Sequence, residues 1–206
     1  MTGVRFMPIS FRNTVRLVAA LLLAAAVTQS VYTALYASGA EVPRQLLWGL
    51  EGVIFTLMAG FAGAAMLAAR QHYLAWSSIA FAAVLNVVQV GVGLTMFGPF
   101  FEVASEVEAF APAAAAIVAF SFMVYNAAKV LLALALIALG LARLDSGSRL
   151  LSGIAVLVGT VAAIANALSM ALGRDFTGEL PIAGGSGVLA TVLLAICLLR
   201  LSGEEA

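Results

Sequence analysis

The chain has 206 residues, of which 64% are hydrophobic and 10% are charged, and its mean hydropathy is +1.11. These values lie far outside the range of soluble domains and predict a protein whose solvent is lipid. Ten basic and ten acidic residues give a net charge of zero, so the charge of the chain does not favour binding of nucleic acid.

The predicted fold is all-α, a polytopic transmembrane bundle of six helices in one integral membrane domain over residues 1–206. A hydrocarbon core of about 30 Å is crossed by roughly 20 apolar residues of helix. Runs of about that length lie near 15–37, 46–69, 73–97, 114–141, 150–172 and 181–201. The connectors between these runs are short, which leaves no room for a second module.

The positions of the prolines support this segmentation independently of hydropathy. Proline lacks the amide proton that a helix interior needs, and we expect all prolines in the tails or at span boundaries. The five are Pro8, Pro43, Pro99, Pro112 and Pro181. A β-barrel would instead show segments of about ten residues that alternate polar and apolar, and the apolar runs do not alternate in this way.

The distribution of arginine predicts that both termini are cytoplasmic, because short cytoplasmic loops retain positive residues. One set of alternate connectors carries Arg5, Arg12, Arg16, Arg70, Arg143, Arg149 and Arg200. The other set carries only Arg44 and Arg174. The expected location is a bacterial-type inner membrane. An alternative interpretation makes the first 30 residues a cleaved secretory signal, which would leave five spans.

Small and amphipathic segments lie near the predicted helix ends. Residues 98–111 alternate phenylalanine and alanine with glutamate, which predicts an amphipathic outer connector, either a solvated acidic face or a vestibule that concentrates cations. Gly184, Gly185 and Gly187 either unwind the last helix, allow close packing or cap the helix. The small residues Ala155, Gly159, Ala163, Ala167 and Ala171, and likewise Gly60 with Ala64, predict tight helix contacts.

Polar side chains inside the spans are the candidate functional residues, since each needs a partner that lipid does not offer. Lys129 is the only lysine and lies within an apolar run from 112 to 142. At about 1.5 Å per residue, several amides and hydroxyls fall at one level in the outer half of the membrane. The predicted ligand or ion pathway comprises Lys129, Glu51, Asn126, Tyr125, Asn86, Gln89, Asn166 and Gln29.

Lys129 and Glu51 are opposite charges at membrane depth, and three interpretations stay open. They form a permanent structural ion pair, a gated or substrate-binding pair, or two separate charges that extend toward the interface. Interhelical hydrogen bonds alone explain the amides as well. A Schiff base between Lys129 and an aldehyde such as retinal is a minor alternative.

Enzymatic and metal chemistry have little support in the sequence. The chain has one histidine, His72, and one cysteine, Cys197, whereas metal and haem sites need several such ligands. No nucleophile elbow or phosphate-binding loop occurs, so no cofactor is expected. The expected partners are the lipid bilayer, a small solute or ion, and the helices of other membrane proteins. The sequence predicts solute binding or passage, with a non-transporting accessory, anchor or assembly subunit as the alternative.

Overall fold

The computed structural model describes residues 9–69, 71–144, 149–173 and 182–204. Several residues used in the sequence predictions lie outside these ranges, namely Arg5, Pro8, Arg70, Arg174 and Pro181. Within them the structure is helical, with α1 over Phe11–Ala37, α2 over Arg44–Ala68, α3 over Tyr73–Glu106, η1 over Glu108–Phe110, α4 over Ala111–Arg143, α5 over Arg149–Leu172 and α6 over Ile182–Glu204.

Six helices of the described chain are long and apolar enough to cross a membrane. This confirms the prediction of a helical bundle and makes the chain a multi-pass membrane protein. Helix ends carry the expected signals. The Ser10 hydroxyl accepts a hydrogen bond of 3.3 Å from the Asn13 amide at the start of α1, and Pro112 lies in the first turn of α4.

The contacts between the helices form a ring with one helix outside it. In the ring α1 packs on α2, α2 on α3, α3 on α4, α4 on α6, and α6 closes the ring on α1. Helix α5 lies outside and packs on α4 and α6. Because α1 and α4 face each other across the ring without backbone contact, only side chains fill the space between them.

The interior of the ring is divided along its length. The half toward the start of α1 and the end of α6 is mostly apolar and includes the buried side chains Leu22, Met58, Trp76, Leu132 and Leu194. Near its end Arg143 is also buried and donates to Cys197 O at 3.1 Å. The half toward the α1–α2 turn contains the buried polar and charged side chains Gln29, Glu51, Asn86 and Lys129. The candidate functional residues therefore occupy one half of the bundle.

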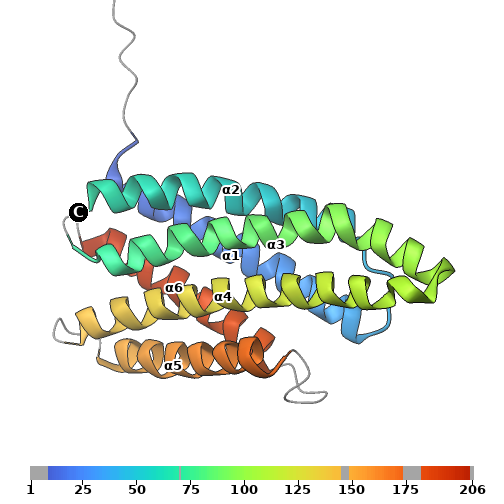
Figure 1. Cartoon of the computed structure of the whole chain (residues 1–206). Coiled ribbons are helices and arrows are strands. Elements are labelled where there is room, and N and C mark those ends of the chain that lie inside the picture. The colour runs from blue at the N-terminus through green and yellow to red at the C-terminus, as the bar shows by residue number, and fades with distance from the viewer. Residues whose placement is uncertain (1–8, 70, 145–148, 174–181, 205–206) are drawn as a thin grey trace, which may run out of the picture.

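Helix α3 does not end where the sequence predicted. It runs for 34 residues, about 50 Å at a rise of about 1.5 Å per residue, and it includes Pro99. Pro99 therefore lies inside a helix, whereas its position after the predicted span 73–97 had suggested a helix end. Gly98 and Pro99 are exposed, so water or lipid headgroups can satisfy the carbonyl that proline leaves free. Residues 98–106 are the last turns of α3, which projects with the start of α4 beyond the other helices (Figure 1).

The small residues have divided roles. A Cβ on Gly159 would lie 2.7 Å from Ile137 Cγ1, so this glycine lets α5 approach α4 as predicted. Ala167 and Ala171 are exposed instead. The predicted tight contact at Gly60 is wrong, because Gly60 is exposed and nothing lies within 4 Å of its Cβ position. Helix α6 is regular from Ile182 onward, which contradicts unwinding at its glycines.

Candidate functional site

Lys129 lies at the centre of the polar half of the ring. Its side chain is 1% exposed and extends from α4 across the interior. The ammonium Nζ donates to Gln29 Oε1 on α1 at 2.6 Å and to Thr191 Oγ1 on α6 at 3.4 Å. It also lies 5.2 Å from the centre of the Tyr125 ring, within the range of a cation–π interaction. Three helices of the ring thus meet at one cation.

A glycine on α6 makes room for this lysine. A Cβ on Gly187 would lie 3.0 Å from Lys129 Cδ and 3.1 Å from Lys129 Cγ. It would also lie 3.5 Å from Asn166 Nδ2, so Asn166 reaches the same place from α5. One turn further along α6, the Thr191 hydroxyl donates to the Gly187 carbonyl at 2.8 Å. The close-packing interpretation of Gly187 fits the structure.

Glu51 is a second buried charge near this cation. Its side chain on α2 is 4% exposed, and Thr28 of α1 lies beside its carboxyl group. Lys129 is within electrostatic range of Glu51, yet the described side chains show no direct ion pair between the two. Because both side chains are enclosed by the ring, neither extends to the lipid interface. The arrangement leaves two opposite charges close together and separately held.

The asparagines of α4 and α5 join the outer helix to the ring. Asn126 Nδ2 donates to Phe122 O at 2.8 Å and to Ser169 Oγ on α5 at 3.1 Å. Asn166 Nδ2 donates to Ala162 O at 2.8 Å and to Ala183 O of α6 at 3.1 Å. These contacts tie α5 to α4 and α6. The predicted residue Asn126 therefore has a packing role, whereas Asn166 also borders Lys129.

The polar side chains of α3 lie on the side of the ring where α3 meets α4. Gln89 Nε2 lies 3.5 Å from Ser121 Oγ of α4, which is a long hydrogen bond. Asn86 is fully buried and donates to Ala82 O of its own helix at 2.9 Å. Its carbonyl oxygen, like that of Asn166, has no partner among the described residues. An unsatisfied buried acceptor costs free energy, so each marks a place that a water or a solute group can fill.

Aromatic rings cover the polar half toward the α1–α2 turn. Tyr32 stacks on Tyr36 with ring centres 6.3 Å apart and on Trp48 at 5.5 Å. Trp48 in turn meets the edge of Phe97 at 5.6 Å. Trp48 lies one turn before Glu51 on α2, so the stack separates the buried carboxylate from the end of the bundle.

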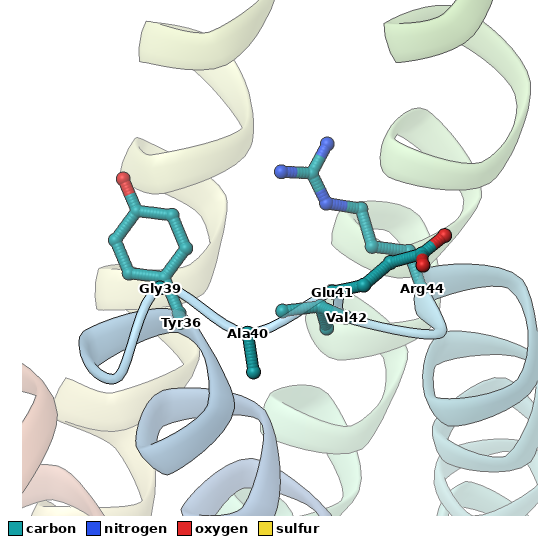
Figure 2. Close-up of a pocket in the computed structure, with 6 residues that line it drawn as sticks. All are labelled: Tyr36, Gly39, Ala40, Glu41, Val42 and Arg44. Atoms are coloured by element: carbon teal, nitrogen blue, oxygen red, sulfur yellow. The ribbon is translucent and has the colours of Figure 1, made fainter.

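Above this stack the α1–α2 turn encloses a hollow of about 420 Å³. Figure 2 shows Tyr36 and Arg44 projecting from the two helix ends to the same side of the turn. Glu41 and Arg44 both line the hollow, and the Arg44 guanidinium lies beside the Tyr32 hydroxyl. Tyr32 and Trp48 thus form an aromatic column between this end of the bundle and Glu51.

Sequence reasoning missed Thr191 and Thr28. Thr191 is the one hydroxyl residue between Gly187 and Leu201, and its spacing of four residues from Gly187 was the available signal. Among the described residues, no group of three or more histidine, cysteine or acidic side chains can hold a metal ion.

Comparison with known proteins gives no match to a family model, to a curated protein or to a solved structure.

Proposed function

We propose that this membrane protein binds a small polar solute or ion at Lys129, in the polar half of the ring, and passes it through the bundle. The observation that carries the proposal is the state of Lys129, a fully buried ammonium held by the neutral groups Gln29 and Thr191. Neutral oxygens compensate a buried charge less well than a carboxylate does. An incoming anionic group therefore has interaction energy to gain there.

The remaining features fit a site that a solute enters from the α1–α2 turn. The hollow at this turn and the aromatic column below it lead toward the buried charges. Of the proposed pathway residues, Gln29, Tyr125 and Asn166 lie next to Lys129, which supports the proposal. With both termini in the cytoplasm, as the arginine distribution predicts, the hollow faces the opposite side of an inner membrane.

A second candidate is a non-transporting subunit whose buried charges only stabilise the bundle. This candidate is favoured by the burial of both charges, since Lys129 is 1% and Glu51 4% exposed. That enclosure argues against one form of this alternative, in which Lys129 pairs with a helix of another protein. The charge lies inside the ring and away from the lipid-facing surface.

Chemical labelling of Lys129 separates the two candidates. Sealed proteoliposomes are treated with a small membrane-impermeant amine reagent, and modification is read by mass spectrometry. The single lysine makes assignment unambiguous, and the N-terminal amine reports sidedness. An Arg44→Lys variant supplies a positive control, because Arg44 is exposed at the hollow. Labelling of Lys129 supports a water path to mid-membrane. Labelling of the control lysine alone would favour the structural candidate.

A further inference from the structure

We infer that the solute is zwitterionic, with its anionic group at Lys129 and its cationic group at Glu51. This inference rests on the proposed function and names the chemical class of the solute. Its basis is that the polar half of the ring holds one cation and one carboxylate in proximity without a direct ion pair. A solute with two opposite charges can contact both.

The two charges are held apart by neighbouring residues of one helix. Gln29 accepts from Lys129, and Thr28, the preceding residue on α1, lies beside Glu51. Opposite charges attract strongly where water is excluded, so this separation is maintained against their attraction. If ion pairing within the fold were the purpose of these residues, contact between them would be the favourable arrangement. A group that bridged the two charges would give each of them a contact of opposite sign.

Charge balance selects the class of solute. A simple anion at Lys129 would bring a second negative charge next to Glu51, and a simple cation at Glu51 would be repelled by Lys129. Burying an uncompensated charge is costly in a low dielectric. A zwitterion adds no net charge and gives each buried group a partner of opposite sign. The charges of Lys129 and Glu51 sum to zero, and this matches a solute whose own net charge is zero.

The aromatic side chains indicate the orientation. Trp48 lies one turn from Glu51, and Tyr32 stacks on it with ring centres 5.5 Å apart. Aromatic faces attract cations, so the Glu51 side suits an amine or quaternary ammonium group. At the mouth, Glu41 and Arg44 line one hollow and again present one charge of each sign. The same combination thus occurs at the entrance and at the buried site.

The test uses the purified full-length chain in lipid nanodiscs and a set of ω-amino acids of increasing length. The probes are glycine, β-alanine, γ-aminobutyrate and ε-aminocaproate, with butyrate and butylammonium as ions of single charge. We expect at least one ω-amino acid to raise Tm, because a ligand that binds only the folded state stabilises it. The two single-charge ions at equal concentration leave Tm unchanged. If no ω-amino acid raises Tm, or if butyrate raises it equally, the inference is wrong.

Two neutralising variants add a readout that loss of folding cannot imitate. Glu51→Gln should lower the affinity for the ω-amino acid that binds best at least tenfold, and it should create binding of butyrate. Lys129→Gln should likewise weaken binding of the ω-amino acid, but it should create binding of butylammonium instead of butyrate. Glu102→Gln removes an exposed carboxylate at the end of α3 and should leave all affinities unchanged. The inference would be overturned if the variants stopped binding the ω-amino acid without gaining binding of the single-charge ion.

The two proposals fail in different ways. Binding of butyrate to the unmodified chain, together with labelling of Lys129, would keep the solute site and reject the zwitterion. An unlabelled Lys129 and no response to any probe would reject both. Protection of Lys129 from the amine reagent by an ω-amino acid, but not by butyrate or butylammonium, would support both.

Discussion

The close contact between Gly93 of α3 and Trp48 of α2 gives a prediction whose size follows from the structure. A Cβ on Gly93 would lie 2.7 Å from Trp48 Cε3 and 3.2 Å from Cη2, and it would be still nearer to Cζ3. Carbon atoms in contact are about 3.5–4.0 Å apart. The indole cannot move freely, because it is packed between Tyr32 and Phe97. Gly93→Ala must therefore displace the ring or separate the two helices.

The matched control is Gly91→Ala on the same helix, where nothing lies within 4 Å of the added Cβ. Both substitutions gain about 0.5–1 kcal/mol from replacing a helical glycine by alanine. The difference between the variants is then the steric cost alone, which is about 1–3 kcal/mol for overpacking. We expect Gly93→Ala to be less stable than Gly91→Ala by this amount.

The assay is equilibrium unfolding in mixed micelles, followed by circular dichroism and by tryptophan fluorescence. In a Trp76→Phe background the fluorescence reports Trp48 alone, because the chain has two tryptophans. Gly93→Ala should shift this emission, and Trp48→Leu combined with Gly93→Ala should recover most of the lost stability. Equal stability of Gly93→Ala and Gly91→Ala, with unchanged emission, would refute the contact and the aromatic column built on it.

Three further predictions concern the polar half and the outer helix. Lys129→Met should lower the free energy of unfolding by about 1–3 kcal/mol, since it leaves buried acceptors without a donor, and adding Glu51→Gln should restore part of the loss in the same micelle assay. A double-mutant cycle on Asn126→Ala and Ser169→Ala should give a coupling energy near 0.6 kcal/mol, and additive losses would show that the hydrogen bond contributes nothing. Gly159→Ala should cost about 1–3 kcal/mol by overpacking against α4, as measured by thermal unfolding in nanodiscs, and unchanged stability would contradict the α4–α5 packing.

The helices were predictable from sequence because lipid imposes a simple rule on composition and length. The predicted span 15–37 corresponds to α1 over Phe11–Ala37, and 46–69 to α2 over Arg44–Ala68. The rule is weaker where a segment leaves the hydrocarbon. At Pro99 hydropathy and proline both indicated an end, whereas the helix continues where polar surroundings can satisfy its free carbonyl. The error thus has a local physical cause.

The identity of the buried polar residues was predictable, but their partners were not. An apolar run makes Lys129 conspicuous in the sequence, while its partner Gln29 is 100 residues away. Their contact depends on the closure of the ring by α1 and α6, which no periodicity encodes. Gly187 illustrates the same limit, since a glycine near a helix start is compatible with unwinding, with capping and with close packing. Only the position of α6 beside Lys129 decides between these roles.

The division of the ring interior sets different demands on binding and on transport. A solute that enters at the α1–α2 turn reaches Glu51 and Lys129 after displacement of the Tyr32–Trp48 stack. Beyond Lys129, α4 continues for 14 residues to Arg143, about 21 Å at about 1.5 Å per residue. The buried Leu132, Leu136 and Leu139 of this stretch belong to a continuous apolar core. Passage to the other side therefore requires that core to separate, whereas binding requires only the aromatic stack to move. If ω-amino acids bind but do not cross proteoliposomes, the apolar half stays closed, and the protein is a solute-binding membrane protein.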